Sequence, residues 1–168
     1  MKIGKLEVDL DELQKFIVKA GQNGYAGNGE KIRETDGSKT FTFQEGNFHY
    51  TDNYAGSFQA PGNEIVRWQK PDGQRIWQMS YSGGILPQFQ GDEELAKQTF
   101  KFLKKALMKG DFEHPFRGPP KFEDEDFIYR TSVKGNIQRF SGEEHIIYNK
   151  LNKIVFSQDF IGGLAIPK

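Results

Sequence analysis

The sequence contains no cysteine, and its 168 residues include only three histidines, His49, His114 and His145. Without cysteine the chain offers no disulfide, no thiolate metal ligand and no cysteine nucleophile. The histidines are far apart in the sequence, and no HExxH, P-loop or GxSxG motif is present. We therefore expect no cofactor and no metal site.

Net charge and long apolar runs are also absent. Lys plus Arg equals Asp plus Glu, at 23 each, so no overall field attracts nucleic acid or an anionic membrane. No apolar run approaches the roughly 18–20 residues that cross a bilayer. Charged residues follow Met1 where a signal peptide needs an apolar stretch. We expect a soluble, cytoplasmic protein with no nucleic-acid or membrane partner.

Aromatic residues, in contrast, are abundant. They make up 14% of the chain, with 15 Phe against six Tyr and two Trp. The core is therefore expected to consist of rings more than of aliphatic side chains. The length suits a single domain over residues 1–168.

Two amphipathic helices are predicted. The first begins after Asp9, which can cap it, and ends at Gly21; its apolar face comprises Leu10, Leu13, Phe16, Ile17 and Ala20. The second begins near Asp92 and ends before Gly110, with acidic residues in its first turn and lysines in its last.

The segments after each helix alternate between apolar and polar residues and contain turn residues, as strands and hairpins do. One turn is expected at Gly46 and another at residues 70–73, where Gly73 can adopt a positive φ. We expect strands at 41–43, 48–58, 64–69, 75–81, 127–133, 137–140, 145–148 and 153–160.

The two halves show the same features in the same order. Each has a helix, a loop with an aromatic residue and glycine, a hairpin at Gly-Asn, and an aromatic strand that ends in Gly-Gly. The sequence therefore predicts an α+β fold with a duplicated α-β-β-β-β unit (residues 9–86 and 92–166). Its antiparallel sheets would pack on two helices about a pseudo-two-fold axis, with a cleft near that axis.

A carboxylate interrupts an aromatic stripe on the strand expected at 48–58. Tyr50, Asp52 and Tyr54 share one face by alternation. One interpretation is a polar anchor in an aromatic pocket, because a buried unpaired charge is costly. The other is a bend in the strand, with Asp52 capping its own backbone.

Three charged residues are further candidates. Glu64 and Glu144 occupy matching places in the two halves, so they either face each other as an acid pair or cap turns at strand starts. Arg117 lies among prolines in a rigid segment. It either binds a ligand anion or forms a structural ion pair.

The remaining candidates are aromatic or amide side chains. Residues 25–29 form a tight turn after the first helix, where Tyr25 and the amide of Asn28 could face a ligand. Trp68 and Trp77 are expected to pair across a hairpin, either in the core or against a ligand cavity together with Tyr81.

These motifs resemble an uncharacterised prokaryotic domain family of unknown function. The resemblance is carried by residues 16–20 and 25–29, Tyr50-x-Asp52-x-Tyr54-x-Gly56, the Trp68…Trp77 hairpin with Met79 and Tyr81, residues 116–119 and Gly162-Gly163-Leu164. It implies a self-contained domain that occurs alone or behind a helix-turn-helix module of the phage-repressor type. Here the first helix begins by residue 10, so we expect no such module before it and no direct regulation of transcription.

Three functions remain open. The leading hypothesis is a non-enzymatic small-molecule-binding or sensory module, which requires an enclosed aromatic pocket with one or two polar anchors. The alternative is homo-oligomerisation or protein interaction, which requires a large exposed apolar patch. The third is an enzyme that brings Asp52, Arg117 or Glu144 within hydrogen-bond reach inside a cleft.

Overall fold

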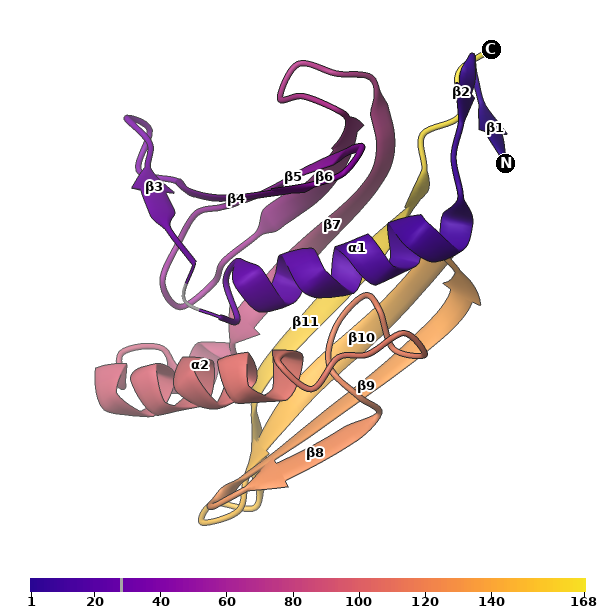
Figure 1. The fold of residues 1–168 in the computed structure, drawn as a ribbon. Helices are drawn as coiled ribbons and strands as arrows, with labels where there is room; N and C mark the ends of the chain where they lie inside the picture. Colours follow the sequence, from indigo (N-terminus) through magenta and orange to yellow (C-terminus); the bar gives the residue numbers. More distant parts are fainter. Residues whose placement is uncertain (28) are drawn as a thin grey trace.

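The computed structural model describes residues 1–27 and 29–168, and within these ranges the chain forms one large antiparallel sheet with two α-helices on one of its faces (Figure 1). The helices are α1 (Leu10–Asn23) and α2 (Glu93–Leu107), and a 3-10 turn, η1 (Pro87–Phe89), precedes α2. The strands are β1 (Lys2–Ile3), β2 (Leu6–Glu7), β3 (Lys31–Arg33), β4 (Lys39–Glu45), β5 (Phe48–Tyr54), β6 (Gly62–Trp68), β7 (Arg75–Ile85), β8 (Lys121–Asp124), β9 (Phe127–Asn136), β10 (Arg139–Tyr148) and β11 (Lys153–Leu164).

The prediction of an α+β fold with two sheets is wrong. Strands make up 46% of the chain and helices 19%, and in the described residues nine strands form one sheet, in the order β3-β4-β5-β6-β7-β11-β10-β9-β8. β7 pairs with β11 from Ile85↔Phe156 to Trp77↔Leu164, and this pairing joins the two halves into one sheet. The five strands β3–β7 follow α1 and the four strands β8–β11 follow α2, so the chain is not a duplicated α-β-β-β-β unit.

Both predicted helices are present, and their starts are those the sequence indicates. The Asp9 side chain accepts hydrogen bonds from the backbone N–H groups of Asp11 (2.9 Å) and Glu12 (3.0 Å), and Asp92 accepts one from Leu95 (2.9 Å). The predicted end at Gly21 is wrong, because α1 continues to Asn23 and is capped by Gly24. One internal glycine costs a helix only about 1 kcal/mol relative to alanine, which is too little to end it.

The hairpins also depart from the sequence pattern in detail. Gly46 adopts a positive φ of 57° as expected, but in the β6–β7 turn it is Gln69, not Gly73, that does so (φ 65°). Gly73 is needed there for close approach, because a Cβ would lie 1.9 Å from the Trp68 carbonyl oxygen. Trp77 pairs with Val66, so the expected cross-strand pair of tryptophans is also wrong.

The predicted break between strands 137–140 and 145–148 does not occur, because β10 runs through Gly142. A Cβ at Gly142 would lie 2.5 Å from Cζ of Phe160 and 2.5 Å from the Ser132 carbonyl oxygen. Glycine therefore lets a neighbouring ring pack against the strand.

We expect Gly142→Ala to lower the free energy of unfolding by about 1–3 kcal/mol, the usual cost of overpacking. Gly21→Ala is the matched control, because apart from the surrounding helix backbone no heavy atom lies within 4 Å of its added methyl group. That change should stabilise the protein by about 0.5–1 kcal/mol, since Gly21 lies inside a helix. Urea denaturation of both variants measures the difference, and equal midpoints would contradict this account of Gly142.

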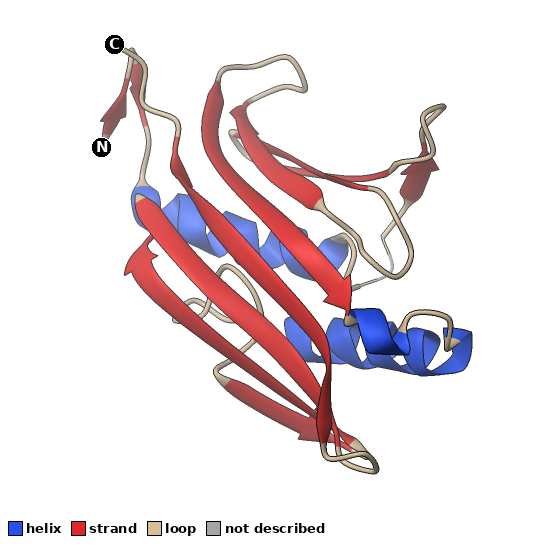
Figure 2. Cartoon of the chain, turned by 180° about the vertical axis from the view of Figure 1, so that it is seen from behind, coloured by secondary structure: helices blue, strands red, loops and turns tan. Residues whose placement is uncertain are grey.

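The helices determine where the core lies. One cluster of buried side chains packs α1 against β5, β6 and β7, and a second packs α2 against β9, β10 and β11. The opposite face of the sheet has no helix across it, as Figure 2 shows. Within the described residues no helix is long and apolar enough to cross a membrane.

Candidate functional site

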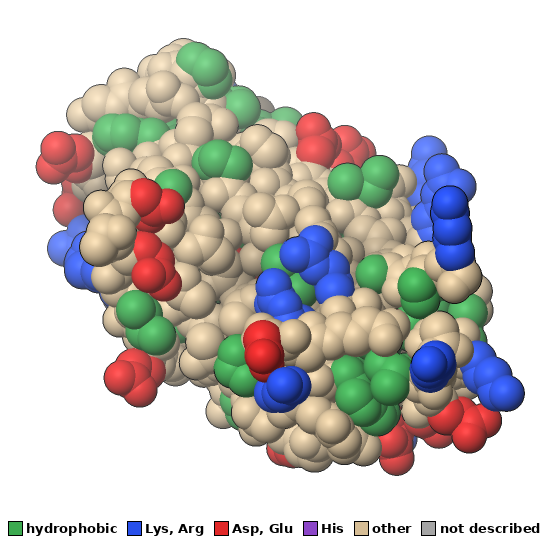
Figure 3. All heavy atoms as spheres, turned by 90° about the horizontal axis from the view of Figure 1, so that it is seen from above, with side chains coloured by type: hydrophobic (Ala, Val, Ile, Leu, Met, Phe, Trp, Pro, Cys, Tyr) green, Lys and Arg blue, Asp and Glu red, His purple; other side chains and the backbone are tan. Residues whose placement is uncertain are grey.

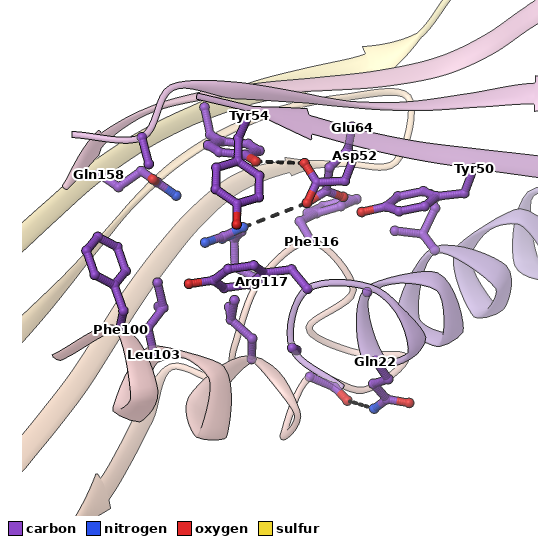
Figure 4. A pocket seen from close by; sticks show the side chains of 18 of the residues that line it. Gln22, Tyr50, Asp52, Tyr54, Glu64, Phe100, Leu103, Phe116, Arg117 and Gln158 are labelled. Atoms are coloured by element: carbon purple, nitrogen blue, oxygen red, sulfur yellow. Dashed lines mark hydrogen bonds and ion pairs between the residues drawn. The ribbon is translucent and has the colours of Figure 1, made fainter. Parts of the chain in front are cut away.

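A cavity of about 260 Å³ lies where the two helices meet the sheet (Figure 4). Its walls come from α1 and the turn that follows it, from α2, from the inner face of β5–β7 and β11, and from the segment after α2. Aromatic and aliphatic side chains dominate the lining, which includes Tyr25, Tyr54, Phe100, Leu103 and Phe116. The cavity is close to the lower end of the roughly 300–1,000 Å³ of small-molecule sites.

Alternation along β5 directs three of its side chains into this cavity. Tyr50, Asp52 and Tyr54 line it, and Asp52 lies inside the strand with an exposure of only 4%. The Tyr81 hydroxyl donates a 2.7 Å hydrogen bond to Asp52 Oδ1. Asp52 is therefore a buried, hydrogen-bonded carboxyl group in the cavity wall, and the bend that was the other interpretation is not formed at this position.

A second carboxylate stands beside Asp52. The β5–β6 register places Glu64 directly opposite Asp52, so both side chains point to the same face of the sheet. Glu64 is 7% exposed and lines the same cavity. It therefore does not cap a turn, and two buried acids lie side by side.

Arg117 is held by a third carboxylate. Its Nε and Nη2 donate hydrogen bonds of 3.1 and 2.6 Å to Glu144 Oε1, and Nη1 lies 3.7 Å from Glu64 Oε1. Figure 4 shows the guanidinium between the acidic side chains of the sheet and the helices. Arg117 thus forms the structural ion pair that was one of its two interpretations, and it also lines the cavity.

Glu144 is completely buried, and its carboxylate accepts hydrogen bonds from three side chains. Besides Arg117, the Tyr129 hydroxyl donates to Oε2 (2.6 Å) and Gln158 Nε2 donates to Oε1 (2.9 Å). The Tyr129 oxygen in turn accepts a hydrogen bond from the Gly118 backbone (3.0 Å). These bonds satisfy the carboxylate and fix Arg117 with little freedom to move.

The two acids opposite each other have strongly shifted pKa values. Burial raises the pKa of Asp52 to about 6, against the lowering effects of the Tyr81 hydrogen bond and the Arg117 charge. Burial, reinforced by the Asp52 charge, raises the pKa of Glu64 to about 8. Perturbed carboxyl groups in a cleft are typical of functional sites.

Arg117, Tyr50 and Tyr81, which surround this acid pair, keep their ordinary charge. Burial by itself lowers the pKa of Arg117, but the Glu144 carboxylate outweighs it and raises that pKa, so the guanidinium stays charged. Burial raises the pKa of Tyr50 and of Tyr81 well above the usual value, so both phenols remain neutral donors.

Two lysines lie beside tyrosine rings that line the cavity. Lys39 Nζ is 5.3 Å from the centre of the Tyr54 ring, and Lys104 Nζ is 4.8 Å from that of Tyr25. The two tyrosine rings contact each other edge to face at 5.7 Å. Positive charge therefore lies beside Tyr54 and Tyr25, whereas the carboxyl groups of Asp52 and Glu64 lie on the sheet side of the cavity.

Most of the residues singled out from the sequence come together in this cavity, namely Tyr25, Tyr50, Asp52, Tyr54, Tyr81 and Arg117, with Glu144 directly behind Arg117. The two tryptophans do not. Trp77 is fully buried in the core and Trp68 packs edge to face on Phe48. Asn28 lies outside the described residues.

Sequence reasoning missed other members of the site. Tyr129, Gln158 and Phe100 were not candidates, and Glu64 was weighed but left out of the expected ligand-binding set. For Glu64 a signal existed, because it alternates with Val66 and Trp68 along β6 and so shares their face. For Gln158 no local pattern distinguishes it from other polar residues in a strand.

Comparison with known protein families gives one match. The family DUF5680, a domain of unknown function, matches residues 52–165, and the chain belongs to this family. Comparison with curated proteins and with solved structures found no significant match. The expected membership of a family of unknown function is thereby confirmed, and the matched range includes every charged residue of the inner wall.

Proposed function

We propose that this protein is a non-enzymatic small-molecule-binding module whose ligand occupies the cavity between the helices and the sheet. The observation that carries the proposal is the combination of aromatic walls with two buried carboxyl groups that face the cavity, Asp52 and Glu64. Binding sites of this kind place a few polar groups in a mainly apolar lining. Charged groups retained in a buried position at a cost in stability point to a binding role.

The face shown in Figure 3 gives less support to the alternative of an interaction module. On the face shown in Figure 3, acidic and basic side chains both occur, and hydrophobic side chains form small separate groups between them. A protein-interaction surface is expected to show a larger continuous apolar patch.

A carboxyl-based enzyme is the second candidate, because Asp52 and Glu64 both titrate near neutral pH. Two acids with separated pKa values can act as general acid and base. Incubation of the protein with any ligand found below distinguishes the two functions. A binding module returns the ligand unchanged, and an enzyme converts it.

The test is a thermal-shift screen of a metabolite library against the wild type and Gly21→Phe. Gly21 lines the cavity, and its Cβ position meets no atom within 4 Å apart from the surrounding helix backbone, so a phenylalanine there extends its ring into the space that a ligand would occupy. A ligand at 100 times its Kd adds about 2.7 kcal/mol, a shift of several degrees. We expect wild type and Gly21→Ala to shift and Gly21→Phe not to shift. Equal shifts in all three would place the ligand elsewhere, and the absence of any shift would contradict the proposal.

A further inference from the structure

The cavity contains more buried negative charge than its own cations balance. Arg117 uses Nε and Nη2 to bind Glu144, and its contact with Glu64 is long, at 3.7 Å. Among the described residues, Arg117 is the cation whose charge most lowers the pKa of Asp52 and of Glu64. Both acids therefore lie buried at a cavity wall without a cation of their own, which is a costly arrangement.

Every group that faces this pair is either neutral or already bonded. Tyr81 on β7 donates to Asp52, Tyr50 on β5 lies beside Glu64, and Glu144 on β10 is bound by Arg117. The guanidinium is consequently not free to bind a ligand anion unless its bonds to Glu144 are broken. Among the described residues, the inner wall thus offers carboxyl oxygens as acceptors and no cation without a partner.

The rest of the cavity suits an apolar body. Phe100 and Leu103 on α2 form a wall on the helix side, and Phe116 lies near the acid pair, with its ring stacked on Phe140. Lys39 and Lys104, which lie beside the Tyr54 and Tyr25 rings, repel a second positive charge, so a cationic ligand group is more stable beside Asp52 and Glu64 than beside these lysines. Aromatic side chains in the lining add cation–π attraction to that of the carboxylates.

We infer that the ligand is a small organic cation, an ammonium group on an aromatic or aliphatic body, with the charge against Asp52 and Glu64 and the body against Phe100, Leu103 and Phe116. This inference rests on the proposed function of the same cavity. Burial holds the pKa of Glu64 at about 8, so much of the acid pair is protonated at neutral pH. A bound cation replaces that proton, and binding therefore releases a proton to solvent.

The test is calorimetric titration of the purified protein with probes matched in shape. Benzylamine and 2-phenylethylamine are the cations, benzyl alcohol and 2-phenylethanol the neutral counterparts, and benzoate and phenylacetate the anions. At pH 7 we expect each amine to bind about tenfold or more tightly than its alcohol, because hydrogen bonds to charged groups are stronger than neutral ones. We expect the carboxylates to bind most weakly.

Binding to three variants tests whether the positive charge of the ligand lies against Asp52 and Glu64. Asp52→Asn and Glu64→Gln should each weaken amine binding about tenfold while alcohol binding changes little. Glu45→Gln is the control, because Glu45 is an exposed carboxylate paired only with Lys19. For benzyltrimethylammonium, which cannot lose a proton, affinity should increase from pH 6 to pH 8 in the wild type, and this increase should be smaller in Glu64→Gln.

Each other outcome overturns the inference. Amines that bind no better than alcohols, or that do not bind at all, rule out a cation site. So does an affinity for benzyltrimethylammonium that does not rise with pH. If alcohols or anions bind the wild type and Gly21→Phe abolishes that binding, the proposed function stands and only the ligand class is wrong. If no compound in the library screen shifts the melting temperature, both the proposed function and the inferred ligand class are wrong.

Discussion

Arg117→Met is expected to lower the free energy of unfolding by about 3–5 kcal/mol, the cost of leaving a buried charge without its partner. Glu144 is fully buried and receives two of its four side-chain hydrogen bonds from Arg117. Methionine keeps the length of the side chain and removes the charge, so the loss reports mainly on the uncompensated carboxylate. Urea denaturation at pH 7 measures the change.

The double variant Arg117→Met/Glu144→Gln is the matched control. The second substitution removes the uncompensated charge of Glu144 but retains an oxygen that can accept a hydrogen bond from Gln158. We expect it to recover part of the loss, and the double-mutant cycle then gives a large coupling between the two positions. If the free energy of unfolding of Arg117→Met stayed within about 1 kcal/mol of the wild-type value, Arg117 would not stabilise the fold, and a role in ligand binding would be favoured instead.

The expectation for Arg117 changed because of a contact that the sequence does not reveal. Its rigid setting among prolines indicated a fixed guanidinium, and the structure shows one. The partner, however, lies 27 residues away on β10. No periodicity or spacing near Arg117 points to Glu144, so the ligand and ion-pair interpretations could not be separated before the fold was known.

Local features of the fold were predictable, and the pairing of distant strands was not. Asp9 and Asp92 cap helices where the sequence places them, and the alternation of Tyr50, Asp52 and Tyr54 correctly gives the inward face of β5. These features depend on neighbours within a few residues. The β7–β11 pairing joins segments more than 70 residues apart, and it alone decides between one sheet and two.

In the candidate site, too, local alternation was predictable from the sequence and the pairing of strands was not. The alternation of residues along β5 predicts that Asp52 is a carboxylate among aromatic rings. The register between β5 and β6 then places Glu64 opposite it. A shift of that register by one residue would have turned Glu64 to the other face of the sheet. The acid pair is therefore a property of strand pairing, and the sequence supplied only one of its members as an anchor.

The acid pair also makes stability depend on pH, and the protein should be less stable at pH 9 than at pH 5. The folded-state pKa values of Asp52 and Glu64 are about 6 and about 8, above the ordinary values of 3.8 and 4.5. Between the ordinary and the raised values the folded state binds more protons than the unfolded state, so stability falls as the pH rises. One pKa unit corresponds to about 1.4 kcal/mol, so the free energy of unfolding should fall by on the order of a few kcal/mol between pH 5 and pH 9.

Glu64→Gln tests which group causes this loss. Glutamine resembles the protonated acid, so the variant should match the wild type near pH 5 and exceed it near pH 9 in the urea midpoint. Glu45→Gln, at an exposed ion pair with Lys19, should follow the wild-type profile throughout. If Glu64→Gln also followed the wild type, the carboxyl would be ionised without cost. The acid pair would then already be balanced within the protein, and no cation would be needed to complete it.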